Sequence, residues 1–319
     1  MIARTFRTAL RGTSLAAPLL LAACAMGPNY HRPGLPASAG YERPTAQPDA
    51  QEAPRVVTGQ DVAADWWRVF GSKDLDALVE TALKNNPSLT AAKASLRAAH
   101  EQVLAQRGAY YPSLSLSVQP SRQQVAQTLS SPLDNNAFLY SLTTTQLSIS
   151  YVPDLFGANR RAVESLAAQR DAQRFELEAA RLTIVTNVVA AAVQDATLRA
   201  QIAETRSIII DQERTLASFR RQLDLGQASR ADVAAQEALL AQAQESLPPL
   251  EKQLETNRDL LASLVGRTPA ELDDIHLELT SITLPGDLPL SLPARLVEQR
   301  PDVRIAEAQL HAASAQVGV

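Results

Sequence analysis

Two stretches of the chain alternate between apolar and polar residues with a period of two. In 113–119, leucine or valine occupies every second position, and serine or glutamine occupies the positions between. Residues 146–151 repeat this pattern. A two-residue period places alternate side chains on opposite faces of a strand. We therefore predict a hairpin over about 112–153, with a polar face of Ser113, Ser115, Ser117, Gln146, Ser148 and Ser150 and an apolar face of Leu114, Leu116, Val118, Leu147 and Ile149.

Four aromatic residues, Tyr110, Tyr111, Tyr151 and Phe156, flank this predicted hairpin at the end opposite its polar loop. A transmembrane β-barrel has an apolar face toward lipid, a polar face toward water, and aromatic residues at the membrane interface. An amphipathic hairpin in a soluble sheet would alternate in the same way. The strand pattern alone therefore leaves both interpretations open.

The long segment between Gly157 and Gly226 contains 68 residues and neither glycine nor proline. As one helix it would span roughly 100 Å at a rise of about 1.5 Å per residue. Apolar residues recur along it at heptad spacing, which is typical of a coiled coil. The seam is expected to hold Leu177, Ile184, Val188, Ala191, Leu198, Ile202, Ile209, Leu216, Phe219 and Leu223.

A tight reversal is predicted where this helix ends. Gly226 can adopt the left-handed conformation that closes a helix, and Ser229 with Asp232 forms a capping box that opens the next one. The returning helix should run to about Val265, with a kink at Pro248 and Pro249. Residues 158–265 are therefore predicted to form an antiparallel coiled-coil hairpin. A helix over about 88–108 and the returning helix together match the long helix in length, so we expect them to stack end to end beside it.

Residues 24–71 precede the first strong helical pattern and are predicted to form an extended tether, because much of this segment is rich in proline, alanine and glutamine. Leu75, Leu78, Val79 and Leu83 then mark one face of a helix that ends or bends at Pro87. We assign 72–286 to a first structural repeat, with 266–286 as the segment that follows the coiled coil.

An internal repeat supports this division. The sequence "PSLTAAKASLRAAHEQV" from Pro87 returns 214 residues later as "PDVRIAEAQLHAASAQV" from Pro301, with eight of 17 positions identical. We therefore expect 287–319 to begin a second repeat. The second copy stops at Val319 before any strand, so a complete protein is expected to continue for roughly 150–200 further residues at this repeat period.

Cys24 is the only cysteine, and it follows a typical secretory leader. Three arginines precede a short apolar core, and "LAAC" ends it at the cysteine, so 1–23 is predicted to be a signal peptide. The motif resembles the lipobox of bacterial lipoproteins, which implies cleavage before Cys24 and acylation of that residue. An ordinary signal peptide with a chance cysteine is the alternative. Ala25 stands where an aspartate would indicate inner-membrane retention, so the resemblance favours the outer membrane.

Charge and motifs argue against several other functions. Removing 1–23 lowers 30 basic residues to 27 against 34 acidic residues, a net charge of −7, which argues against a nucleic-acid partner. The sequence contains no Walker, G-x-S-x-G or G-x-G-x-x-G motif, and the histidines lie far apart, so no enzyme, metal site or cofactor is predicted beyond the covalent lipid. Asp273 and Asp274 are interpreted as a solvated loop.

Several motifs together resemble the TolC family of outer membrane factors, in its lipid-anchored OprM/NodT-like branch. They are "CAMGPNYHRP" after the lipobox, "WW..F" at 66–70, "NNPSL", "YYPSLSLS", "YVPDLFGANRR" and "RPDV..AE", in order across almost the whole chain. The resemblance implies a mainly α fold with a β-hairpin. Long antiparallel helices would form a periplasmic α-barrel, and each chain of a homotrimer would give four strands to a 12-stranded membrane barrel. Most of the second repeat, with two of those strands, is missing here.

The same resemblance implies a passive exit duct that receives small molecules from an inner-membrane efflux pump through a periplasmic adaptor. It favours a lumen-facing role for the polar hairpin face and a lipid-facing role for the apolar face. It also implies that the adaptor meets the tip formed by Gly226, Ser229, Arg230 and Asp232. The alternatives are a lipid-anchored periplasmic adaptor, an anchored periplasmic enzyme, or a nonfunctional fragment of the channel.

Overall fold

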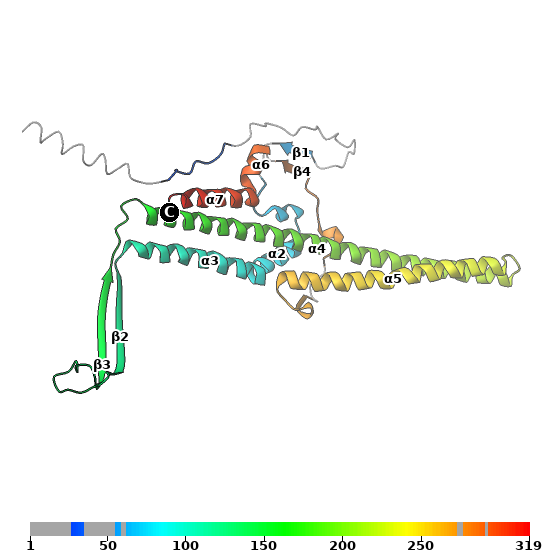
Figure 1. Cartoon of the computed structure of the whole chain (residues 1–319). Coiled ribbons are helices and arrows are strands. Elements are labelled where there is room, and N and C mark those ends of the chain that lie inside the picture. Colours follow the sequence, from blue (N-terminus) through cyan, green and yellow to red (C-terminus); the bar gives the residue numbers. More distant parts are fainter. Residues whose placement is uncertain (1–26, 35–54, 59–61, 273–276, 291–292) are drawn as a thin grey trace, which may run out of the picture. The chain divides into compact units, whose positions relative to one another are not determined.

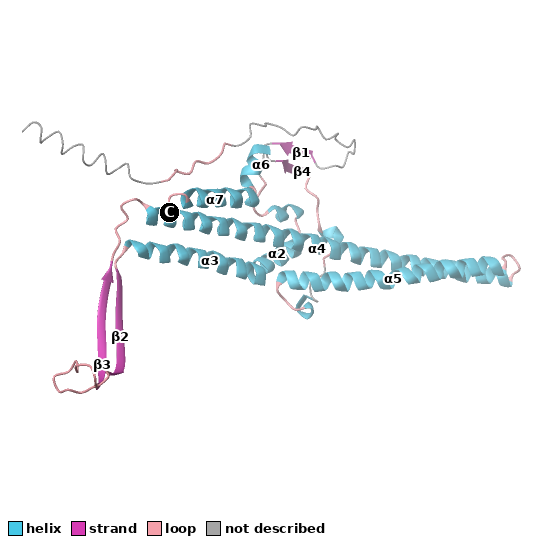
Figure 2. Ribbon diagram, in the orientation of Figure 1, coloured by secondary structure: helices cyan, strands magenta, loops and turns pink. Residues whose placement is uncertain are grey.

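The computed structural model describes residues 27–34, 55–58, 62–272, 277–290 and 293–319 (Figures 1 and 2). The predicted signal peptide, Cys24 and the Asp273–Asp274 pair lie outside these residues. The chain divides into two compact units, one made of Met1–Arg32, Ala98–Asp171 and Glu307–Val319 and the other of Pro33–Arg97 and Ala172–Ala306. Each unit is described by itself.

The first unit contains the predicted hairpin. Strands β2 (Ser113–Gln124) and β3 (Leu139–Ser150) pair antiparallel over 12 residues each, from Ser113 opposite Ser150 to Gln124 opposite Leu139. The backbone N–H of Val125 donates to the carbonyl of Phe138 at 2.8 Å and closes the connecting loop. Both strands are longer than the alternation predicts. The pairing continues past Gln119 on β2, as far as Gln124 opposite Leu139 on β3.

Pro120 lies within β2, opposite Thr143, directly after the alternating stretch 113–119. Proline has no backbone N–H to donate to the hydrogen-bond ladder. It therefore occurs in a strand only at positions where an N–H would not bond to a neighbouring strand.

Helical segments complete the first unit. They are the end of α3 (Pro87–Arg107), the short 3-10 helix η2 (Gly108–Tyr110), the start of α4 (Ala158–Asp224) and the end of α7 (Pro301–Gln316). Four of the five apolar side chains buried among these helices are alanines. The five are Val103, Ala168, Ala308, Ala312 and Ala315.

The second unit holds the main hydrophobic core, built around α2 (Lys73–Asn85). The Ser72 side chain caps this helix by accepting from the Leu75 N–H at 3.4 Å. Trp67, in the 3-10 helix η1 (Trp66–Phe70), is only 3% exposed and packs into the same core. The predicted face is confirmed, and the core members from α2, α4 and α5 (Arg230–Val265) are Leu75, Leu78, Val79, Ala82, Ile184, Val185, Val188, Val189, Ala191, Ala192, Ala196, Leu261, Ala262 and Val265.

Helices α4 and α5 run antiparallel, as predicted, and lie side by side in Figure 1. Arg206 pairs with Glu251 at 2.8 Å, and Arg220 pairs with Glu237 at 2.7 Å. The α4 residue farther along the chain pairs with the α5 residue that comes earlier, as antiparallel helices require. The helical assignment of α5 continues through Pro248 and Pro249 without interruption.

The start of α3 meets the end of α5, which confirms the predicted end-to-end stacking. The Asn86 side-chain amide donates to the Leu264 carbonyl at 2.8 Å, and its oxygen accepts from the Ser88 and Leu89 N–H groups at 2.9 and 3.2 Å. One asparagine therefore caps α3 and binds the last turn of α5. Gly266 ends α5 with φ +73°, so close to Asn85 that an added Cβ would lie 2.6 Å from the Asn85 carbonyl oxygen.

A second, small sheet was not predicted. Strand β1 (Arg55–Thr58), within the predicted tether, pairs in parallel with β4 (Asp287–Leu290) at the start of the predicted second repeat. The remaining elements are the 3-10 helices η3 (Pro269–Leu272) and η4 (Leu279–Ser281) and the short helix α6 (Pro293–Gln299). The second repeat then begins α7 at Pro301, as the first begins α3 at Pro87, so the repeated sequence forms the same element twice.

Candidate functional site

The hairpin has two chemically distinct faces that both strands share. Ser113 lies opposite Ser150, Ser115 opposite Ser148, and Ser117 opposite Gln146, whereas Leu114 lies opposite Ile149 and Leu116 opposite Leu147. Directly paired residues project to the same side of a sheet. The register therefore joins the polar sets of the two strands into one face and the apolar sets into the other.

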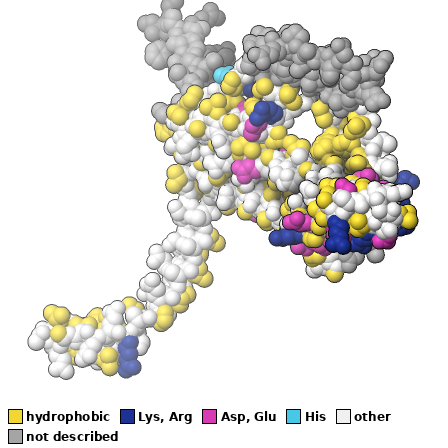
Figure 3. Space-filling model, turned by 90° about the vertical axis from the view of Figure 1, so that its right-hand side faces the viewer, with side chains coloured by type: hydrophobic (Ala, Val, Ile, Leu, Met, Phe, Trp, Pro, Cys, Tyr) yellow, Lys and Arg dark blue, Asp and Glu magenta, His cyan; other side chains and the backbone are white. Residues whose placement is uncertain are grey.

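The apolar face is uncovered. Leu114 and Leu116 are each 67% exposed, and Ile149 is 71% exposed. Figure 3 shows hydrophobic side chains along one side of the hairpin. Exposed apolar rows on this scale mark a surface that meets lipid or another protein.

The polar face carries hydroxyl and amide groups without charge. Its groups bond locally, since the Ser113 hydroxyl donates to the Ser150 carbonyl at 3.2 Å and the Gln146 amide donates to the Ser148 hydroxyl at 3.2 Å. Each strand has 12 residues, and a membrane-spanning strand needs about 9–11. The paired strands are therefore long enough to cross a bilayer, and the division into a polar and an apolar face extends over residues 113–117 and their partners.

Aromatic side chains stand exposed near the ends of the strands that lead into the helices. Tyr111 is 73% exposed, Tyr151 53% and Phe156 59%. Aromatic residues at the ends of membrane-spanning strands are typical of the interface between lipid and water.

The helical tip has the predicted caps. Gly226 has φ +74°; its N–H donates to the Leu223 carbonyl at 2.9 Å, and the Gln227 N–H donates to the Gln222 carbonyl at 2.8 Å. These two bonds form a Schellman motif, which needs a left-handed residue at the position of Gly226.

The capping box on the other side of the tip is also present. The Asp232 N–H donates to the Ser229 hydroxyl at 3.2 Å, and the Ser229 N–H donates to the Asp232 carboxylate at 2.8 Å. The backbone and hydroxyl hydrogen bonds from Ser229 lower the pKa of Asp232 below its ordinary value. Arg230 is exposed beside this box. The tip is thus a rigid turn that presents a cation.

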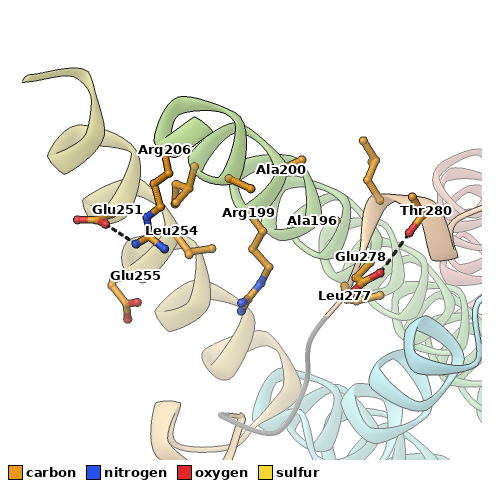
Figure 4. A pocket seen from close by; sticks show the side chains of 13 residues that line it. Ala196, Arg199, Ala200, Arg206, Glu251, Leu254, Glu255, Leu277, Glu278 and Thr280 are labelled. Carbon is orange, nitrogen blue, oxygen red and sulfur yellow. Dashed lines mark hydrogen bonds and ion pairs between the residues drawn. The ribbon is translucent and has the colours of Figure 1, made fainter. Parts of the chain in front are cut away.

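A groove that the sequence did not reveal lies between α4, α5 and residues 277–280, with a volume of about 870 Å³ (Figure 4). Arg206 and Glu251 form an ion pair on its wall, and Arg199 also lines it. Arg199 pairs through Nε with the buried Asp195 at 2.6 Å, while Arg199 Nη2 and Asp195 Oδ1 have no partner within the described residues. The spacing of four residues between Asp195 and Arg199 is the only sequence signal for this pair.

A polar cluster around Arg161, in the first unit, was also not predicted. This side chain is 9% exposed and bonds to Glu164 and to residues of the segment 27–32. Of the histidines, His311 lies in this cluster, 3.0 Å from Glu164. Within the described ranges, no three potential metal ligands gather, and no helix is long and apolar enough to cross a membrane.

Comparison with known proteins agrees with this architecture. The pyoverdine export outer membrane protein OpmQ of Pseudomonas putida is 29% identical over 304 residues, which cover 94% of this chain and 62% of that protein. Outer membrane protein OprJ of Pseudomonas aeruginosa is 28% identical over 308 residues, covering 96% and 62%. The chain therefore spans slightly less than two thirds of the length of these relatives.

Solved structures show the same fold. The outer-membrane channel OprN superposes with a TM-score of 0.74 at 27% identity, covering 93% of this chain and 64% of that one. VceC from Vibrio cholerae superposes with a TM-score of 0.69 at 26% identity, covering 81% and 61%. The predicted fold class, mainly helical with a β-hairpin, is confirmed.

The family model described as "Outer membrane efflux protein" matches residues 78–267, which include the strand hairpin and the coiled-coil hairpin. This match covers more than half of the chain, and it confirms the resemblance seen in the sequence motifs. The chain belongs to the outer membrane efflux protein family.

Proposed function

We propose that this chain forms part of a passive exit duct for small molecules through the outer membrane, within a multicomponent efflux system. The observation that carries the proposal is the cross-strand register. Over residues 113–117 and their partners, it gives the hairpin one wholly uncharged polar face and one exposed apolar face. Family membership adds the outer membrane as the location.

The hairpin needs partners to be stable. A two-stranded hairpin is at best marginally stable alone, and its outer edges expose unpaired backbone groups. In lipid such edges are not tolerated, so the strands must join others in a closed barrel. A homotrimer with four strands from each complete chain would close a 12-stranded barrel, with Ser113, Ser115, Ser117, Gln146, Ser148 and Ser150 toward the lumen and Leu114, Leu116, Val118, Leu147 and Ile149 toward lipid.

The paired helices α4 and α5 would continue the duct into the periplasm. Their capped tip supports contact with a periplasmic adaptor, because a rigid turn keeps Gly226, Ser229, Arg230 and Asp232 in fixed positions. Arg230 would be the exposed contact. An inner-membrane pump would deliver substrate through that adaptor, and the duct itself would need no catalyst or cofactor.

The lipid anchor on Cys24 is part of the same proposal, and it rests on the lipobox and leader. Relatives are named for the export of pyoverdine and the efflux of toluene. Organic small molecules are therefore the proposed substrate class.

Planar-bilayer recording tests the channel function. The complete gene product, purified in detergent, should migrate as a trimer resistant to dodecyl sulfate and open discrete conductance steps. A Leu116→Asp variant should fail to insert, because a charge facing lipid costs about 2–4 kcal/mol at the midplane for basic residues and somewhat less for acids. The matched Ser115→Asp variant should insert and shift ion selectivity toward cations. A monomer without conductance would contradict the proposal.

A further inference from the structure

We propose that residues Gly27–Arg32 form an anchor-proximal strap that docks on α4 and α7, and that Arg161 is the positioning residue that holds it. The strap begins three residues after Cys24. Its consequence for membrane anchoring rests on the proposed lipidation of that cysteine, whereas the docking itself does not.

Arg161 makes the central contact. Its Nη2 donates to the Gly27 carbonyl at 3.2 Å and to the Asn29 side-chain oxygen at 2.7 Å, while Nη1 binds Glu164 at 2.7 Å. The side chain is only 9% exposed. A guanidinium buried this far requires partners for its donors, and the strap supplies two of them.

Glu164 connects this contact to α7. Its other carboxylate oxygen lies 3.0 Å from His311 Nε2, and the His311 ring stacks on Tyr30 of the strap with centroids 4.4 Å apart and planes 15° apart. Burial favours the neutral acid, but hydrogen bonds from His311 and Arg161 outweigh it and hold the pKa of Glu164 below its ordinary value. The carboxylate therefore stays ionised between its two partners.

Both ends of the strap make further contacts, one with α7 and the other with the residues that follow α7. Arg32 pairs with Glu307 at 2.8 Å, and the Tyr30 hydroxyl lies 3.5 Å from the same carboxylate. At the other end, Gly27 has φ +100°, and an added Cβ would lie 2.8 Å from Gly318 Cα. Contacts through charge, ring stacking and close backbone approach thus bind one short segment along its whole length.

This docking fixes where the anchor can enter the membrane. Three residues reach at most about 11 Å, so a lipid on Cys24 must insert within that distance of Gly27. Arg161 lies in the first turn of α4, directly after the hairpin and its aromatic residues. The strap therefore holds the anchor near the end of the hairpin that leads into the helices, and the anchor does not move freely at the end of a long tether.

Spin labelling tests the docking without relying on lipidation. The full chain carrying Cys24→Ser has no thiol, so His31→Cys, at an exposed strap position, provides a single labelling site. We expect a slowly moving label. Arg161→Met should increase the mobile fraction about tenfold or more, since hydrogen bonds to a charged group contribute about 1.5–3 kcal/mol.

The matched control is Arg160→Met, which removes the same charge at an exposed neighbour whose backbone bond to Asp154 remains. It should change the mobile fraction by less than about twofold. Asn29→Ala should mobilise the label in part, and combining it with Arg161→Met should add nothing further. Circular dichroism should show that each variant keeps its helices.

The lipidated chain in liposomes, labelled at the same position, separates docking from anchoring. Arg161→Met should mobilise the label there as well. The proposal would be overturned by a label that is already mobile in the chain with Arg161 intact, or by one whose mobility responds equally to Arg161→Met and Arg160→Met. These spectra report only the docking of the strap and do not depend on channel conductance. A chain without conductance whose label is still immobilised through Arg161 would contradict the proposed function but not the docking.

Discussion

At the residue scale, the Asp195–Arg199 pair gives the sharpest test of packing. Asp195 is 3% exposed at its side chain, and its ion pair with Arg199 is 2.6 Å long. Asp195→Ala should lower the free energy of unfolding by about 3 kcal/mol, because it leaves a largely buried guanidinium unpaired. Chemical denaturation followed by circular dichroism measures this loss.

The control for that variant is Asp211→Ala, on the same helix. Asp211 pairs with Arg214, but the two side chains are 68% and 76% exposed. An exposed pair of this kind should contribute less than about 1 kcal/mol. If both variants lowered the free energy of unfolding by the same amount, the buried Asp195–Arg199 pair would not stabilise the fold more than an exposed pair does, which would contradict this prediction.

We expect the stability of the helical tip to depend on pH through Asp232. Its pKa is lowered by the hydrogen bonds from Ser229, so the bonds stabilise the fold fully above the ordinary pKa of 3.8, and this contribution is lost as the pH falls through the lower folded value. Amide exchange at Ser229 should therefore accelerate in acid below that range. Asp232→Asn should abolish the dependence, since an amide oxygen accepts without titrating. Unchanged acid sensitivity in that variant would show that another group is responsible.

At the element scale, the turn between α4 and α5 depends on one backbone conformation. Gly226→Ala should destabilise the chain by about 1–2 kcal/mol, because the left-handed conformation is strained for a residue with a Cβ. Thermal unfolding measures the change. Gly286→Ala is the matched control in the same unit, where φ is not in the left-handed region and the added methyl meets nothing within 4 Å. It should leave the melting temperature nearly unchanged.

Local elements were predictable because their signals are local. The capping box at Ser229, the left-handed Gly226 and the two-residue alternation of the hairpin all depend on neighbours within a few positions. The boundaries of α4 and α5 follow from the absence of glycine at helix positions and from these caps. The end of β2 was not predictable, because the alternation stops at Gln119, whereas Pro120 and the polar residues after it continue the strand.

Apart from the antiparallel pairing of α4 with α5 and the stacking of α3 on α5, the long-range contacts were not predictable from one sequence. Strands β1 and β4 lie far apart along the chain and are too short to show a period. The groove beside Arg199 and the docking of Tyr30 on His311 likewise join segments that periodicity does not relate.

At the scale of the whole molecule, repetition and exposure point to a larger assembly. The repeated sequence forms α3 and then α7, each starting at the equivalent proline. The hairpin leaves Leu114, Leu116, Leu147 and Ile149 uncovered within the chain. Apolar surface of this kind is stable only when lipid or protein covers it. The proposed function requires lipid on this face of the hairpin and water on the other.

Cysteine labelling of β2 in outer-membrane vesicles tests that requirement most directly. Ser115→Cys and Leu116→Cys are adjacent positions on opposite faces, and the proposed acylation of Cys24 would leave the parent chain unreactive as a background. A charged, membrane-impermeant maleimide should label Ser115→Cys and spare Leu116→Cys, whereas a lipid-confined reagent should do the reverse. Protection of Ser115→Cys together with aqueous labelling of Leu116→Cys would contradict the account.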